Sequence, residues 1–376
     1  MFDLLFITEP EPAGVKIYSF ELINSFRRYL PGVEIAVLCF EKQKEYVKSK
    51  ITDGISLILV PESKSNLVCC AQRRYKGVKK WFSEDVEIRN SIVKYDICLT
   101  PYANGPLVDF SYFIPHVGVI HDLQGQKIAW NKKKSVGTAR FIFRSWLKYR
   151  KLTEVVAISR HTWLGLYKFC RRKSKIIYNS ISHFEYEPHR PSDFPENFKE
   201  YILDVNSFFK YKNAETLIKA FNKIKDDFPD LCLYLKGNNH PDFQSLPVLV
   251  DELNIADRVH FDREFRSNEE MAWLYKNAKL FVSPSFMEGF GYTPVEAIIN
   301  EIPTIVSDID TLKEVTHGCA VIFDPHSVDE LAESIKQILN NPIPKEELIV
   351  RSESLKEYYS NKTQVSKFID ILNSIL

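Results

Sequence analysis

Two glutamates on either side of a glycine turn are the residues of this chain best placed to do chemistry. Glu288 precedes Gly289-Phe290-Gly291, and Glu296 follows the turn with seven residues between the two carboxylates. A phosphate needs only the neutral backbone amides of such a turn, so the carboxylates must serve another purpose. Because a carboxylate accepts two or more O–H hydrogen bonds, sugar hydroxyls are its natural partners. The segment therefore predicts a site for an anion and a sugar together.

The residues around this turn place it between a strand and a helix. Residues 280–282 are a short apolar run typical of a buried strand, and Ser-Pro-Ser at 283–285 ends it. Thr293, Pro294 and Glu296 predict a helix that begins with Thr293 as N-cap and Glu296 completing a capping box. Free N–H groups and the positive end of the helix dipole would then converge on the turn, which favours an anion there.

The two glutamates and the Gly-Phe-Gly between them resemble the retaining glycosyltransferases of the family 4 type, which have the GT-B architecture. The resemblance covers residues 200–340 well and the N-terminal half only in patches. It implies an α/β protein with two doubly wound Rossmann-like domains that face a central cleft. It also implies a C-terminal helix that crosses back to the first domain.

The resemblance assigns roles to individual residues. Glu288 would hold hydroxyls of the donor sugar, Glu296 the ribose hydroxyls of the nucleotide, and Lys212, in a Lys-Asn pair, the donor diphosphate. His121, in a His-Asp-Leu sequence after an apolar run, would approach the donor sugar from the other domain. Glu288, His121 and Lys212 are thus the predicted catalytic residues. The predicted donor-binding residues are Glu296, Gly289, Phe290, Gly291, Tyr292, Thr293, Ser207 and Gly14. Family members need no metal and no cofactor besides the nucleotide sugar.

Three positions depart from the family pattern. Ser207 stands where the family has an arginine that helps to neutralise the diphosphate, although Lys210 or Arg263 could supply that charge. Gly14 is the one glycine left of a glycine pair, and Glu301 replaces a glycine. Structural interpretations also remain open, because Lys212 could be a solvated residue, His121 a core residue and Glu296 a helix cap alone.

The function implied is transfer of a hexose, mannose-like or glucose-like, from a nucleoside-diphosphate sugar to a glycan or lipid-linked acceptor. Such a reaction would belong to the synthesis of a surface polysaccharide such as lipopolysaccharide, O-antigen or capsule. The departures keep two alternatives open. One is a catalytically inactive GT-B protein with a binding or regulatory role, and the other is a GT-B sugar phosphorylase or nucleotide-sugar epimerase.

Charge is divided unevenly along the 376 residues, although the net charge is only +1. Residues 1–180 contain 30 Lys and Arg against 16 Asp and Glu, which leaves 20 against 33 for the remainder. A basic half predicts an anionic partner. Residues 73–82 and 132–151 mix basic and aromatic side chains, and the second stretch is typical of an amphipathic helix at an anionic membrane surface. An ordinary surface helix with inward aromatics is the alternative; nucleic acid is not expected, because no recognised module is present.

The length predicts two domains, and alternating strand and helix patterns predict parallel sheets. We expect an acceptor domain at 1–180, which begins with a strand at 3–8, and a proline-containing linker at 181–199. A nucleotide-sugar donor domain should follow at 200–357, and a last helix within 358–376 should pack on the first domain.

No apolar run approaches the about 18 residues of a membrane span. Seven scattered cysteines, without Cys-x-x-Cys, are typical of reduced thiols. We therefore expect a cytoplasmic protein that can associate peripherally with the inner face of the membrane.

Overall fold

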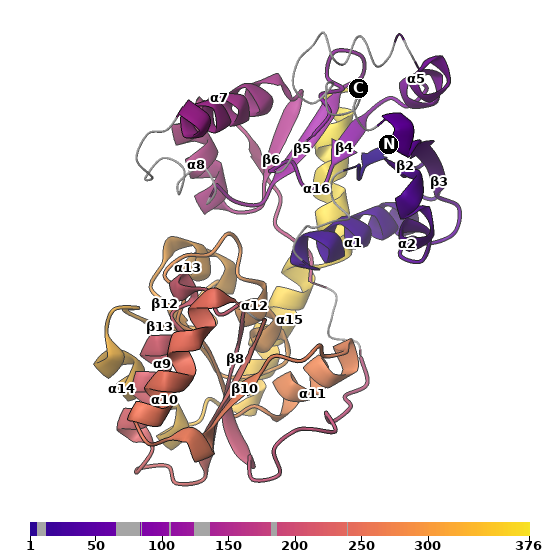
Figure 1. Cartoon of the computed structure of the whole chain (residues 1–376). Helices are drawn as coiled ribbons and strands as arrows, with labels where there is room; N and C mark the ends of the chain where they lie inside the picture. The colour runs from indigo at the N-terminus through magenta and orange to yellow at the C-terminus, as the bar shows by residue number, and fades with distance from the viewer. Residues whose placement is uncertain are drawn as a thin grey trace. The chain divides into compact units, whose positions relative to one another are not determined.

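The computed structural model describes residues 1–5, 13–64, 83, 85–104, 107–123, 136–181, 186–238 and 240–376. They form two compact units, one made of Met1–Ser180 with Asn361–Leu376 and the other of Ile181–Ser360. Each unit contains one sheet of parallel strands flanked by helices (Figure 1). Within the described ranges, no helix is long and apolar enough to cross a membrane.

The first unit has a seven-stranded sheet in the order β3-β2-β1-β4-β5-β6-β7. Its strands are β1 (Phe2–Asp3), β2 (Ala36–Phe40), β3 (Ser56–Val60), β4 (Cys98–Thr100), β5 (His116–Ile120), β6 (Glu154–Ala157) and β7 (Lys175–Ile176). Its helices are α1 (Ala13–Tyr29), α2 (Lys44–Lys48), α5 (Val86–Val93), α7 (Val136–Lys151), α8 (Arg160–Cys170) and α16 (Asn361–Asn373). The strand order reverses at the β1–β4 pair, and such a switch point opens a crevice at the carboxyl ends of the strands.

The last helix of the chain, α16, packs on α1 of the first unit (Figure 1). Phe368 of α16 is fully buried, and its ring centroid lies 5.8 Å from that of Phe26 on α1. Gln364 Nε2 donates to the Tyr178 carbonyl over 2.9 Å, which holds the start of α16 against the end of the first sheet. The predicted return of the terminal helix to the first domain is confirmed.

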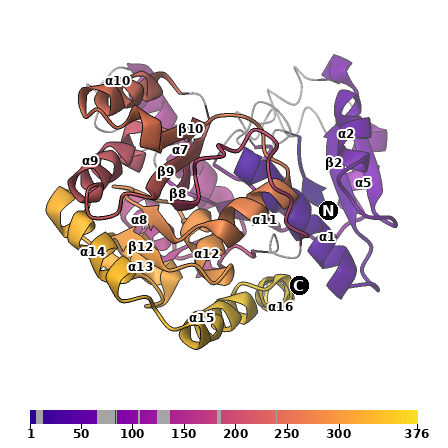
Figure 2. The ribbon, with the colours of Figure 1, turned by 90° about the horizontal axis from the view of Figure 1, so that it is seen from below.

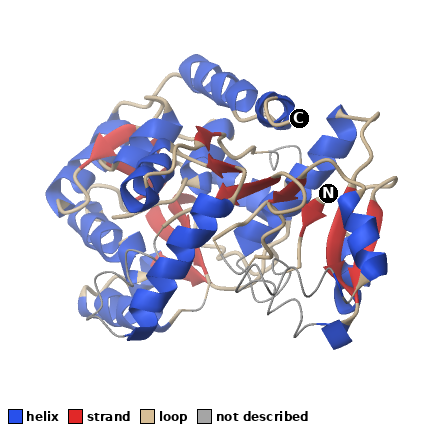
Figure 3. Ribbon diagram, turned by 90° about the horizontal axis from the view of Figure 1, so that it is seen from above, coloured by secondary structure: helices blue, strands red, loops and turns tan. Residues whose placement is uncertain are grey.

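The second unit has a six-stranded sheet in the order β10-β9-β8-β11-β12-β13. Helices surround its strands in Figures 2 and 3. Its strands are β8 (Glu200–Asn206), β9 (Leu231–Gly237), β10 (Val259–Asp262), β11 (Leu280–Ser283), β12 (Thr304–Ser307) and β13 (Val321–Phe323). Its helices are α9 (Ala214–Ile224), α10 (Ser245–Glu252), α11 (Asn268–Asn277), α12 (Tyr292–Ile299), α13 (Asp310–Thr316), α14 (Val328–Asn340) and α15 (Lys345–Tyr358). The switch point here is the β8–β11 pair.

Hydrophobic periodicity explains why the helices of the second unit cover its sheet. In α9, Leu217, Phe221 and Ile224 recur at helical spacing, and all three are fully buried. In α14, Leu331 and Ile335 repeat the pattern and join the same core cluster. The two helices therefore lie side by side on one face of the sheet (Figure 2).

Two predicted segments differ in the structure. The first strand was expected over residues 3–8, but β1 covers Phe2–Asp3, and residues 6–8 lie outside the described part of the chain. Of the predicted linker, residues 186–199 belong to the second unit and pack on it: Phe194 and Phe198 are buried in its core. The proline content correctly indicated irregular backbone, but these apolar side chains keep the segment on the surface of the sheet.

Glu301, the residue in place of the family glycine, has a φ of 61°, in the left-handed region that favours glycine. We predict that Glu301→Gly raises the free energy of unfolding of the second unit by about 1 kcal/mol, because the side-chain penalty of this conformation disappears. Urea unfolding at pH 7 measures the change. The Glu301→Ala control keeps a Cβ and should gain little. An equal gain in both variants would attribute the effect to the glutamate side chain and not to the backbone.

Candidate functional site

Lys212 and Glu288 meet at the switch point of the second sheet. Lys212 ends the short 3₁₀ turn Lys210–Lys212 after β8, and Glu288 lies in the loop after β11, the strand that pairs with β8. Lys212 Nζ lies 2.7 Å from Glu288 Oε1 and 2.9 Å from Oε2. Their side chains are 16% and 12% exposed. Two of the three predicted catalytic residues therefore form one mostly buried ion pair.

Two hydroxyl groups form further hydrogen bonds to the glutamate of this pair. Ser285 Oγ donates to Glu288 Oε1 over 2.8 Å, and Thr311 Oγ1 of α13 donates to the Glu288 carbonyl over 3.2 Å. On the lysine side, the Phe286 amide donates to the Tyr211 carbonyl over 2.8 Å. The loops that follow β8 and β11 are thus joined by backbone as well as by the ion pair.

Burial and pairing act in opposite directions on Lys212. Burial alone would lower the pKa of its ammonium, but the negative charge and hydrogen bonds of Glu288 outweigh it, and the pKa lies above its ordinary value. Lys212 is therefore a cation at neutral pH. A positive charge at the carboxyl ends of β8 and β11 is suited to an anionic ligand.

Asp204 is a site residue that the sequence analysis did not single out. It lies in β8 and is 1% exposed, and burial raises the pKa of its carboxyl to about 8. Its Oδ2 accepts a hydrogen bond from the Asn206 carboxamide, whose Oδ1 accepts from the Phe208 amide over 2.7 Å. Asp204 thereby supports the turn that contains Ser207. An acidic residue inside the apolar run of 201–205 was the available sequence signal.

The predicted capping box at the start of α12 is wrong. The helix begins at Tyr292 with Gly291 as its N-cap, and no side chain caps it. Gly291 has a φ of 94°, and a Cβ at this position would lie 2.7 Å from Leu312 Cδ2. The turn therefore requires glycine. Glu296 Oε2 accepts a hydrogen bond of 2.7 Å from the Tyr275 hydroxyl of α11.

The other predicted donor-binding residues of the turn differ in exposure. Phe290 is buried, with its ring edge-on to those of Tyr292 and Tyr359, so its backbone rather than its side chain is suited to a ligand. Gly289, Tyr292 and Thr293 are half-buried at the start of α12. The turn thus presents backbone at the helix N-terminus beside Glu288.

Ser207 is half-buried in the turn after β8, where the adjacent Phe208 has a φ of 44°. The two cations considered as substitutes for the family arginine have other surroundings. The Arg263 guanidinium lies 4.8 Å from the centre of the Phe243 ring. The backbone amide of Lys210 donates to Asp242 over 2.9 Å, and Lys210 is among the residues that line a groove of the second unit.

His121 belongs to the first unit and directly follows β5. It is buried; its Nε2 lies 2.9 Å from the Pro101 carbonyl, and its ring is edge-on to that of Tyr18 with 4.6 Å between centroids. Burial lowers its pKa to about 4, so the imidazole is neutral at pH 7. Asn104, missed by the sequence analysis, accepts from the His121 amide over 2.8 Å, and Lys148 Nζ donates to the Asn104 carbonyl over 2.9 Å.

Gly14 lies in the first turn of α1, where a Cβ would meet no heavy atom within 4 Å. Residues 6–12, which precede it, lie outside the described part of the chain.

Of the predicted basic stretches, residues 73–82 and 132–135 also lie outside the described part of the chain. The rest of the second stretch forms α7. On it, Phe141 and Phe143 are exposed, whereas Tyr149 is fully buried.

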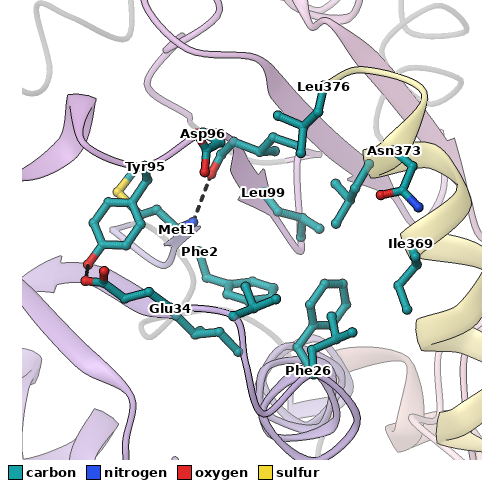
Figure 4. A pocket seen from close by; sticks show the side chains of 15 residues that line it. Met1, Phe2, Phe26, Glu34, Tyr95, Asp96, Leu99, Ile369, Asn373 and Leu376 are labelled. Carbon is teal, nitrogen blue, oxygen red and sulfur yellow. Dashed lines mark hydrogen bonds between the residues drawn. The ribbon is translucent and has the colours of Figure 1, made fainter.

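An apolar pocket of about 220 Å³ in the first unit is lined by residues of β1, α1 and α16 (Figure 4). Met1 and Ile97, which line it, precede β1 and β4, and Phe26 and Leu376 complete its apolar wall. It therefore lies at the amino ends of the strands, whereas ligand crevices in such sheets form at the carboxyl ends. The pocket is not part of the candidate site.

Residues 187–355 match the family model described as glycosyl transferases group 1. The O-antigen chain mannosyltransferase RfbU of Salmonella typhimurium is 32% identical over 178 residues, which are 47% of this chain and 47% of that protein. The O-antigen chain mannosyltransferase B of Escherichia coli is 32% identical over 145 residues, 38% of this chain and 37% of that protein. The chain thus spans about half the length, or less, of these curated relatives.

Solved structures match along the whole chain. Anabaena HepE, solved with UDP and glucose, has a TM-score of 0.71 at 16% identity and covers 99% of this chain and 98% of its own. WaaG, a glycosyltransferase involved in lipopolysaccharide biosynthesis, has a TM-score of 0.65 at 15% identity with coverages of 99% and 98%. These likenesses and the two parallel-sheet units confirm the predicted GT-B fold.

We predict that the ion pair of Lys212 and Glu288 is energetically coupled. Lys212→Met and Glu288→Gln should each destabilise the second unit, since each leaves a mostly buried polar group without its partner. The double variant should lose about 1–3 kcal/mol less than the sum of the single losses. Urea unfolding of the four proteins at pH 7 measures this coupling.

The exposed pair of Lys279 and Glu200, 2.8 Å apart, provides a matched control for that cycle. Its side chains are 51% and 46% exposed, so the same substitutions should give a coupling below about 1 kcal/mol. Additive losses at Lys212 and Glu288 would contradict the buried ion pair.

Proposed function

We propose that this chain, a GT-B protein whose residues 187–355 are a group 1 glycosyltransferase domain, transfers a hexose from a nucleoside-diphosphate sugar to a glycan or lipid-linked acceptor during synthesis of a surface polysaccharide. The observation that carries the proposal is the buried ion pair of Lys212 and Glu288 beside the N-terminus of α12. The O-antigen mannosyltransferases among the relatives favour a mannose-like hexose.

The chemistry of the transfer suits the groups at this site. When the bond between the anomeric carbon and the diphosphate breaks, negative charge grows on the leaving diphosphate. The Lys212 ammonium and the backbone at 289–291 would stabilise that charge, while Glu288 would accept hydrogen bonds from the sugar hydroxyls. Glu296, whose Oε2 accepts from the Tyr275 hydroxyl, would also accept from the ribose hydroxyls.

We further propose that the reaction retains the anomeric configuration and uses no metal and no cofactor besides the donor. Retention follows from the family resemblance, with the acceptor attacking on the face that the diphosphate leaves. His121, neutral at pH 7 because of burial, would hydrogen-bond to the donor sugar without adding a charge. Ser207 would contribute backbone to the donor site, and Gly14 would allow close approach of the donor.

The two alternatives make different demands on the same residues. A regulatory GT-B protein has no need of a buried, hydrogen-bonded Lys–Glu pair at the switch point, and such a pair has a desolvation cost of several kcal/mol. A phosphorylase would release a sugar phosphate, and an epimerase would change the sugar without an acceptor. Analysis of the products with and without acceptor separates the transferase from a phosphorylase, an epimerase and an inactive regulatory protein.

The donor prediction is tested by thermal unfolding with GDP-, UDP-, ADP- and dTDP-sugars. One class, at about 100 times its dissociation constant, should stabilise the protein by about 2.7 kcal/mol. The shift should shrink in Glu288→Gln and in Lys212→Met, and His121→Gln should lower the transfer rate. The control is Glu333→Gln, on the exposed surface of α14. No shift with any donor would overturn the transferase proposal in favour of a regulatory protein.

Association with an anionic membrane is proposed through α7. Phe141 and Phe143 are 44% and 58% exposed, Phe143 stacks on Trp146, and the Arg150 guanidinium lies over the Trp146 ring. The last turn of α7 is basic. Exposed aromatics beside cations are suited to the headgroup region of a membrane.

Phe143→Ser should therefore weaken binding to phosphatidylglycerol vesicles about tenfold, since one phenyl ring no longer enters the membrane. Co-sedimentation at low and high salt measures the binding, which should decrease with salt. Tyr46→Ser, at an exposed aromatic of α2 in the same unit, should leave it unchanged. Binding that is absent, or insensitive to salt, would contradict the membrane proposal.

A further inference from the structure

The second unit contains a groove beside the ion pair of Lys212 and Glu288. This groove has a volume of about 750 Å³. It is formed by the start of α9, the 3₁₀ turn Pro241–Gln244 that leads into α10, and the loops after β11 and β13. Helices α9 and α10 lie side by side at this edge of the unit (Figure 2). Its size is within the range of small-ligand sites.

Aromatic rings line one side of the groove. Phe286, from the loop after β11, and His326, from the loop after β13, are stacked with ring centroids 4.8 Å apart and an angle of 26° between their planes. Both side chains are exposed. Phe209 also lines the groove, and its ring stacks on that of Tyr211. Flat, exposed rings of this kind can pack against the apolar C–H face of a sugar ring.

The charged side chains of the groove balance one another. Lys219 forms an ion pair with Glu215, and Asp242 accepts a hydrogen bond from the amide of Lys210. The lining thus contains two lysines and two carboxylates. This balance gives no net attraction to an anion, while the carboxylate oxygens can still accept from hydroxyl groups. A neutral, hydroxyl-rich ligand fits both the rings and the charges.

The groove and the ion pair share the same loops. Phe286 lies two residues before Glu288. Its backbone amide donates a hydrogen bond to the carbonyl of Tyr211, the residue before Lys212. Asn213, which lines the groove, is the next residue after Lys212. The groove is therefore built on the same loops as the ion pair, within a few residues of it along the chain.

We propose that this groove is a subsite for the glycan chain of the acceptor, binding neutral sugar units beyond the one that reacts. The subsite rests on the proposed transferase function. It would make long acceptors bind more tightly than short ones, because each sugar unit stacked on Phe286 and His326 adds contact area.

Binding is measured without a donor, by saturation-transfer NMR on the full chain with mannotetraose, maltotetraose and cellotetraose. At least one tetrasaccharide should bind. Phe286→Ala and His326→Ala should each weaken that binding about threefold to tenfold, the loss expected for one ring contact. The matched control is Phe265→Ala, because Phe265 is 91% exposed and does not line the groove. Unchanged melting temperatures establish that the variants are folded.

A transfer assay separates this subsite from the reaction itself. His326→Ala should raise KM about threefold to tenfold for a tetrasaccharide acceptor, leave KM for a monosaccharide glycoside unchanged, and keep kcat. Glu288→Gln should abolish transfer and keep tetrasaccharide binding. Transfer with no tetrasaccharide binding, or binding insensitive to both ring variants, would overturn the subsite alone. Absence of transfer in the unmodified protein, with ring-dependent binding retained, would overturn the reaction and leave a glycan-binding groove.

Discussion

The carboxamide of Asn213 holds together the loops on which this site depends. Its Nδ2 donates to the carbonyls of Pro284 and Pro325, each over 2.9 Å, and its Oδ1 accepts from Thr216. One buried side chain therefore joins the segments that follow β8, β11 and β13. The left-handed φ of 60° at Asn213 ends the turn that contains Lys212 and starts α9. The ion pair and the groove keep their geometry because these three segments cannot slide independently.

The ion pair also limits which ligands can bind. Lys212 and Glu288 satisfy each other in the structure, and each is mostly buried. An anion alone would attract Lys212 and leave Glu288 without a partner, while a neutral sugar alone would leave Lys212 unsatisfied. A ligand with both a diphosphate and neighbouring hydroxyls replaces both halves of the interaction at once. In the proposed function, discrimination against free phosphate and free sugar thus arises from the pair itself.

Sequence pattern predicted the parts of the structure that depend on local apolar runs and on strand ends. Leu280 to Val282 form a buried strand, as their apolar run predicted. The role of Lys212 was predicted from the family resemblance, and only the structure shows that its ammonium pairs with Glu288. The start of α12 was mispredicted because Thr293 has the chemistry of a cap, while the conformation of Gly291 decides where the helix begins. Backbone conformation at one residue cannot be read from side-chain types alone.

Other features depended on contacts between distant residues. The pKa of Asp204 and the hydrogen bond from Tyr275 to Glu296 arise from packing of separate strands and helices, which no local pattern contains. The proline-containing segment before β8 looked like a linker, yet Phe194 and Phe198 are core residues. Composition predicted its irregular backbone and missed its burial.

The assignment of α16 to the first unit has a consequence for the order of folding. The second unit is one continuous stretch, Ile181–Ser360, whereas the first unit needs Asn361–Leu376 to complete the packing around Phe26. During synthesis from the N-terminus, the second unit has all of its residues before the first one does. Vectorial translation usually lets the N-terminal domain fold first. Here the residues of the first unit that precede Ile181 are joined by Asn361–Leu376 only after the whole second unit has been made, and until then the surface of α1 around Phe26 lacks its contact with α16.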